Sequence, residues 1–131
     1  MNELFILFLM IFMHVIADYN VQGCLAELKQ KQWWVYNCEK LNKDFNKYKN
    51  DYIIALLMHA FSWAFMIMLP LFFTNGFNMN LATTIILLAN TVIHFYIDDL
   101  KANQDKINLV QDQSFHMIQI LVTWLIWTNI V

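Results

Sequence analysis

The sequence predicts an all-α integral membrane protein, a four-helix bundle with an amphipathic cytoplasmic segment between its first and second helices. The 131 residues are 60% apolar and 14% charged, whereas soluble domains average about 25% charged residues. Four apolar stretches approach or reach the roughly 20 residues that cross a hydrocarbon core. None alternates with a period of two, which favours helices over barrel strands. Two Gly and one Pro also leave little turn chemistry for a many-stranded β protein.

The predicted helices form a single transmembrane domain over residues 1–131. They lie at about 3–19, 52–73, 79–98 and 113–131. No Lys or Arg precedes the first helix and no small-residue cleavage site follows it, so we expect a retained helix rather than a signal peptide. The amphipathic segment covers about 22–50, and its Trp33–Trp34 pair suits the membrane interface.

The distribution of lysines predicts the orientation. All eight Lys fall in the first and third connections between the predicted helices. These two connections lie on one side of an antiparallel arrangement, and the positive-inside rule makes that side cytoplasmic. We therefore expect a multi-pass protein of the cell inner (cytoplasmic) membrane, with both termini and the turn at 70–80 outside.

Polar residues within the predicted helices gather at one membrane face. His14 and His94 lie near the ends of the first and third predicted helices, and His59 and His116 lie near the starts of the second and fourth. In an antiparallel bundle these positions share one face, so all four imidazoles lie at a similar depth in the membrane. Three of them have an Asp four residues away, on the same helical face and on the side nearer water. The predicted cluster faces the cytoplasm and contains His14, Asp18, His59, His94, Asp98, Asp112 and His116.

Such a cluster has the chemistry of a metal site. Imidazole and carboxylate are the usual ligands of Zn²⁺, Mn²⁺ and Fe²⁺, and bundles build such sites from facing helices. Seven donors exceed the roughly three that a catalytic zinc takes from protein, and they would suit two metals about 3.5–4 Å apart. Each His alone could be a packing residue and each Asp a cap. The joint pattern favours one or two divalent ions, zinc first, because ionisable groups at membrane depth are costly.

This cluster predicts a membrane-embedded, metal-dependent hydrolase acting on a phosphoester, either a lipid headgroup or a cytosolic nucleotide. Asp18, Asp98 and Asp112 would serve as metal ligands or as the general base. Lys101 could neutralise a substrate phosphate as a point charge. The alternative is a transport or channel protein that relays protons or passes an ion through the same residues.

The expected partners are the lipid bilayer and the phosphoester substrate. A formal charge of −2 and the absence of Arg give no reason to expect a nucleic-acid polymer. With only two Gly the chain has no glycine stripe for close helix dimerisation, and four helices can already enclose the polar cluster. We therefore expect a monomer or a homodimer.

The polar residues form four ordered motifs. They are His14-x3-Asp18-Tyr19-x2-Gln22, the mid-chain His59, His94-x3-Asp98-x2-Lys101 and Asp112-Gln113-x2-His116. These motifs resemble those of the DUF3307 family of small prokaryotic and phage membrane proteins. The resemblance covers nearly the whole chain, although Trp33–Trp34 and several Lys stand where that family has one Trp and one Lys. More distantly, the chain is similar to membrane-bound metal-dependent hydrolases and to zinc-dependent phospholipase C, which implies metal-dependent hydrolysis.

Overall fold

The computed structural model describes residues 2–130, which form helices and connecting loops without a strand. The all-α class is therefore confirmed over this range. The α-helices are α1 (Glu3–Val15), α2 (Leu25–Leu28), α3 (Lys31–Lys40), α4 (Asp51–Thr74), α5 (Leu81–Ala102) and α6 (Leu109–Ile130). A π-helix, η1 (Ile16–Val21), continues α1, and a 3₁₀ turn, η2 (Phe45–Lys47), precedes α4.

Three helical segments of the described chain are long and apolar enough to cross a membrane. They are Glu3–Val21, Phe45–Thr74 and Leu81–Ala102, and they correspond to the first three predicted helices. α6 is as long as α5, at 22 residues, but it is not among the three segments that are apolar enough to cross a membrane. Its polar positions include Asp112, Gln119 and Thr123, which lower its average hydropathy.

The helix boundaries differ from the predicted ones where polar residues lie inside a helix. α5 runs on to Ala102 and α6 already begins at Leu109, so the link between them spans only 103–108. The apolar pattern could not reveal these extra turns, because half of their residues are polar or charged. α5 begins at Leu81, where the Asn80 side chain accepts a 2.9 Å hydrogen bond from the Thr83 N–H and caps the helix.

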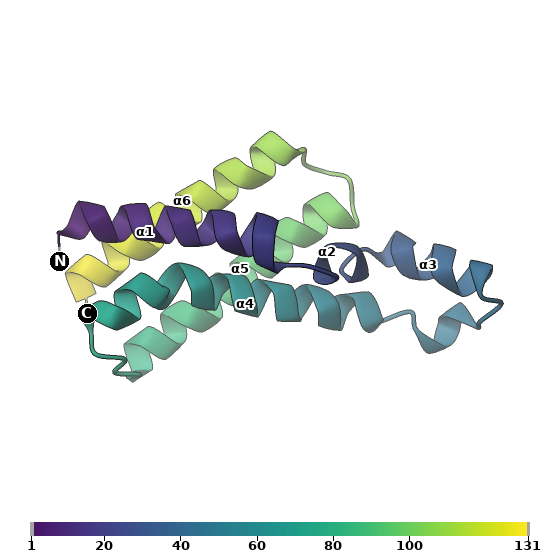
Figure 1. Cartoon of the computed structure of the whole chain (residues 1–131), viewed down its shortest axis with the longest axis horizontal. Coiled ribbons are helices and arrows are strands. Elements are labelled where there is room, and N and C mark those ends of the chain that lie inside the picture. The colour runs from purple at the N-terminus through teal and green to yellow at the C-terminus, as the bar shows by residue number, and fades with distance from the viewer. Residues whose placement is uncertain (1, 131) are drawn as a thin grey trace.

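The four long helices alternate in direction (Figure 1). Both chain ends and the α4–α5 connection lie at one end, which we call the terminal end. The other two connections lie at the opposite end, together with His14, His59, His94 and His116, and we call it the histidine end. α1 contacts α4 and α6, and α5 contacts the same two helices. α2 and α3 extend past the histidine end.

An apolar core fills the interior towards the terminal end. Met10, Ile67, Leu71 and Ile120 are fully buried there, and Trp127 is nearly so. Packing of this kind must hold membrane helices together, because lipid tails are as apolar as the side chains and supply no hydrophobic drive. The buried His and Asp side chains of the described residues all lie in the other half of the molecule.

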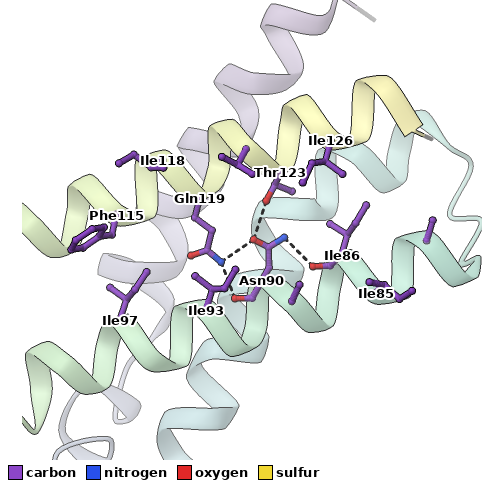
Figure 2. Close-up of a pocket in the computed structure, with 13 residues that line it drawn as sticks. Ile85, Ile86, Asn90, Ile93, Ile97, Phe115, Ile118, Gln119, Thr123 and Ile126 are labelled. Atoms are coloured by element: carbon purple, nitrogen blue, oxygen red, sulfur yellow. Dashed lines mark hydrogen bonds between the residues drawn. The ribbon is translucent and has the colours of Figure 1, made fainter.

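A buried polar trio links α5 to α6 at mid-length (Figure 2). The Gln119 amide donates to the side-chain and backbone oxygens of Asn90, both at 2.8 Å. The Thr123 hydroxyl donates to the same Asn90 Oδ1 at 2.9 Å. Asn90 thus accepts from two residues of the facing helix, which fixes the register of α6 against α5.

Replacing Asn90 by Leu should weaken this attachment. The Gln119 amide and the Thr123 hydroxyl would lose their acceptor, so we expect the free energy of unfolding in detergent to fall by about 1 kcal/mol, the usual size of interhelical hydrogen bonds in membranes. Thr84→Val is the matched control, because the Thr84 hydroxyl bonds only to the Asn80 carbonyl at the start of its own helix. Equal stability of the two variants would show that the trio does not hold α6 in place.

Candidate metal centre

The structure brings all seven predicted His and Asp residues together at the histidine end. The four imidazoles are at most 2% exposed. Asp18, Asp98 and Asp112 are 7%, 2% and 0% exposed. α1 with its extension η1 and α5 run towards this end, whereas α4 and α6 start from it. Each of the four long segments therefore contributes residues to one buried cluster.

The local helix geometry places the pairs as their spacing predicts. Asp98 lies one turn after His94 on α5, and Asp112 lies one turn before His116 on α6. Asp18 lies within the π-helix η1, a form that occurs mainly as single wide turns at functional sites. From there its Oδ1 faces His59 Nε2 at 3.5 Å and His94 Nε2 at 4.0 Å. The first helix thus delivers its carboxylate to imidazoles of α4 and α5.

Asp98 occupies the middle of the cluster. Its Oδ2 is 3.2 Å from His59 Nε2 and 2.6 Å from Lys29 Nζ. Its Oδ1 is 3.5 Å from His116 Nε2 and 3.7 Å from His94 Nε2. One carboxylate therefore faces three imidazoles and an ammonium group, from four different segments of the chain.

Two overlapping sets of side chains have the spacing of metal ligands. Asp18, His59 and His94 form one set, and His94, Asp98 and His116 form the other, with the ligand atoms of each set within 4.8 Å of one another. The Nε2 atoms of His59 and His94 are 3.3 Å apart. Two nitrogens bound tetrahedrally to zinc at roughly 2.0–2.1 Å would stand about 3.4 Å apart. The imidazole spacing is therefore that of two ligands of one ion.

Unpaired buried atoms support the same interpretation. Both ring nitrogens of His116 and Asp112 Oδ1 are buried without a hydrogen-bond partner among the described residues. His116 Nε2 and Asp112 Oδ1 face each other at 3.3 Å. Buried polar atoms normally have partners, and a cation between these two would supply the missing interaction. The donor set, imidazole nitrogen and carboxylate oxygen, fits a divalent ion such as zinc, manganese or iron.

His14 is placed differently from the other histidines. Its Nδ1 accepts a 2.8 Å hydrogen bond from the Trp63 indole N–H, which can only donate. Its Nε2 lies 3.0 Å from the Gln113 amide oxygen, to which it donates as the neutral tautomer. Both ring nitrogens are thus engaged by protein groups. His14 lies beside the two ligand sets and belongs to neither.

Gln113 carries this hydrogen-bond chain on to the carboxylates. Its amide nitrogen donates to Asp18 Oδ2 at 3.1 Å and to Asp112 Oδ2 at 3.0 Å. Trp63 also stacks on the His94 ring, with 4.0 Å between centroids. Hydrogen bonds and packing around metal ligands fix their orientation. Trp63, His14 and Gln113 surround the proposed ligands in this way, through hydrogen bonds and stacking.

Two lysines border the cluster on its outer side. Lys101 Nζ lies 2.6 Å from Asp112 Oδ2, and Lys29 Nζ is equally close to Asp98 Oδ2. A polar cleft of about 390 Å³ opens over Asp98, with both lysines, Gln22 and Asp105 in its wall. The cluster is therefore reached from outside through a passage flanked by two cations.

The sequence points to Lys101 beside the cluster and places Gln113 in one of the polar motifs, but it does not single out Lys29 or Trp63. The segment 22–50 contains six lysines, and nothing in its local pattern distinguishes Lys29. Trp63 lies in an apolar stretch, where a Trp is typical of a core.

Comparisons with protein-family models, with curated proteins and with solved structures find no match to this chain. The resemblance to the DUF3307 family and to metal-dependent hydrolases therefore stays a prediction. The function has to be inferred from the cluster itself.

Replacing Lys29 by Met should destabilise the metal-free protein. The side chain of Asp98 is 3% exposed, and removal of one partner of a buried ion pair costs about 3 kcal/mol or more. We expect a corresponding fall in the denaturant midpoint in detergent with a chelator present. Lys31→Met is the control, since Lys31 is exposed and bonds Asn103 through its backbone N–H. If both variants unfold like the wild type, the Lys29–Asp98 pair contributes nothing to stability.

Proposed function

We propose that this chain is a membrane-embedded, metal-dependent hydrolase that cleaves a phosphoester at the cytoplasmic face. One observation carries the proposal. Three imidazole Nε2 atoms and the carboxylates of Asp18, Asp98 and Asp112, delivered by four helical segments, converge in a buried cluster. The proposed ligands of one or two divalent ions, zinc first, are Asp18, His59, His94, Asp98, Asp112 and His116, with His14 as a further candidate if its hydrogen bonds open.

We infer that the membrane domain is a four-helix bundle in which α6 is the fourth span. α6 contacts both α5 and α1, and its buried polar residues are spaced four, three and four positions apart, so they share one face. These residues are Asp112, His116, Gln119 and Thr123. The positive-inside rule then places the lysine-bearing histidine end in the cytoplasm. The proposed membrane is the cell inner membrane.

The residues of the chain can perform most tasks of phosphoester hydrolysis. A divalent ion at the cluster would supply Lewis acidity and lower the pKa of a coordinated water. Lys29 and Lys101, at the cleft, would neutralise the substrate phosphate as point charges. The side chain of Lys101 is 36% exposed, so it can turn from Asp112 towards a bound phosphate. A carboxylate among Asp18, Asp98 and Asp112 that is not bound to metal would accept the proton from water.

The distribution of polar residues favours an enzyme over a channel or proton pathway. A pathway needs polar groups along the whole membrane normal. Here the buried polar side chains continue from the cluster to the trio of Asn90, Gln119 and Thr123. Thr83, buried at the start of α5, bonds the Asn80 carbonyl of its own helix and does not extend this series. Beyond them the apolar core, including Met10 and Leu71, fills the space towards the terminal end. A closed site at one face fits this arrangement better than a conduit.

Asp98→Asn tests the metal-dependent reaction. The exchange keeps the shape of the side chain and removes the charge at the centre of the cluster. We expect purified wild type to retain one or two equivalents of zinc by elemental analysis and to hydrolyse a generic phosphodiester. We expect the variant to lose both bound zinc and activity, the latter by roughly a hundredfold or more, the scale seen when metal-site residues are altered.

Glu39→Gln is the matched control, because it also exchanges a carboxylate for an amide, on an exposed position of α3. It should retain the zinc content and the rate of the wild type. Wild-type protein that binds no metal, or an Asp98→Asn variant that hydrolyses as fast as wild type, would overturn the proposed function. Ion conductance of the reconstituted wild type without hydrolysis would favour the channel alternative.

Reporter fusions test the orientation. A reporter that is active only outside the cytoplasm should be active when it is fused after Asn78, in the α4–α5 connection, and inactive after Gln104, in the α5–α6 link. The reason is that the lysines border the second position and not the first. The reverse pattern would place the cluster on the outer face, away from the cytoplasm.

A further inference from the structure

An apolar groove of about 550 Å³ lies between α5 and α6, on the flank of the molecule. Figure 2 shows Ile93 and Ile97 of α5 facing Phe115 and Ile118 of α6 across it. Ile93 is 47% exposed and Ile118 is 55% exposed, so the groove is open to its surroundings. In a membrane those surroundings are lipid tails. The groove is therefore an indentation of the lipid-facing surface.

The polar side chains in the groove are hydrogen-bonded to one another or to the backbone, except at Gln119 Oε1. The Asn90 Oδ1 accepts from Gln119 and Thr123, and the Asn90 amide nitrogen donates to the Ile86 carbonyl. The remaining lining is aliphatic apart from Phe115. An occupant would thus meet an almost wholly apolar wall, which suits a hydrocarbon chain.

One stripe of α5 joins the groove to the candidate metal centre. Ile85, Ala89, Ile93 and Ile97 line the groove at intervals of four residues, and Lys101 is the next position of the same stripe. The last groove residue of α5, Ile97, directly precedes Asp98. On α6, Phe115 directly precedes His116. The groove therefore stops one helical turn before Lys101, and Asp98 and His116 are buried on the inner side of the same two helices.

The length of the groove suits a lipid chain. Its α5 wall runs from Ala82 to Ile97, about 22 Å at 1.5 Å per residue. One leaflet is about half of a 30 Å hydrocarbon core, so an acyl chain that spans one leaflet can lie along this wall over its whole length.

We propose that this groove binds an acyl chain of an anionic phospholipid, with the lipid phosphate at Lys101 beside the candidate metal centre. The combination of an apolar groove with a cation at its head selects an amphiphile that carries a negative headgroup. The part of this inference that has the bound lipid hydrolysed rests on the proposed function. It assigns membrane phospholipid, rather than a cytosolic nucleotide, as the substrate class.

Photocrosslinking tests the groove independently of hydrolysis. The probe is phosphatidylglycerol with a diazirine in one acyl chain, added to the full chain in phosphatidylcholine nanodiscs with a chelator present. Peptide mapping should place the crosslinks on α5 and α6 within 82–97 and 115–126. Unlabelled phosphatidylglycerol should compete at about tenfold lower concentration than added phosphatidylcholine, or ~1.4 kcal/mol. Lys101→Met should abolish this preference.

Ala89→Trp should reduce crosslinking about tenfold, because Ala89 is exposed within the groove. Ile118→Trp fills the groove from α6 and serves if the first variant does not fold. Val92→Trp is the matched control, since Val92 is 66% exposed on α5 and outside the groove; it should crosslink like wild type.

Crosslinks spread evenly over all lipid-facing helices would overturn the proposal, as would chain-to-chain crosslinks showing a second copy in the groove. The chelator separates this result from the proposed function. Groove-specific crosslinks in a protein that hydrolyses nothing would support the lipid site and contradict the proposed hydrolase function. Metal-dependent hydrolysis of a soluble phosphodiester without groove crosslinks would support the hydrolase function and contradict the lipid site.

Discussion

The burial of three carboxylates among four imidazoles is the constraint to which the rest of this fold conforms. Moving an ionised carboxylate out of water costs several kcal/mol unless a partner compensates for the loss. Asp98 has Lys29, Asp112 has Lys101, and Asp18 has the Gln113 amide and His59. These partners come from different parts of the chain, so satisfying the carboxylates fixes how the helices meet. A divalent ion would add charge compensation at Asp112 Oδ1 and at the His116 ring nitrogens, which have no hydrogen-bond partner among the described residues.

This constraint also gives the segment between α1 and α4 a defined place. Lys29 reaches Asp98 of α5, while Asn103, just after α5, bonds the Lys29 carbonyl and the Lys31 N–H. α2 contacts α4 as well. The part around α2 is therefore attached to the long helices and forms a wall of the cleft over Asp98. The almost fully buried cluster therefore meets the surface at this cleft, with Asp98 in its wall.

Much of the cluster could be predicted because its geometry is local. The four-residue spacing of His94 and Asp98, and of Asp112 and His116, fixes a shared face, and alternating helix direction brings the pairs to one end. The wide turn at η1 and the partners Lys29 and Trp63 could not be predicted. Lys29 depends on how α2 packs, and Trp63 on which face of α4 meets His14 and His94. Such contacts join residues 31 to 69 positions apart, and no local pattern encodes them.

The polar character of α6 follows from the same cluster. Asp112, His116, Gln119 and Thr123 are buried against the other helices, so their polarity faces the cluster and the trio rather than lipid. The exposed positions of α6 include Ile118, Leu121, Val122 and Leu125, which are all aliphatic. An average over the whole helix combines both faces, so it hides the apolar character of the exposed one. In that face α6 resembles the three helices that are apolar enough to cross a membrane.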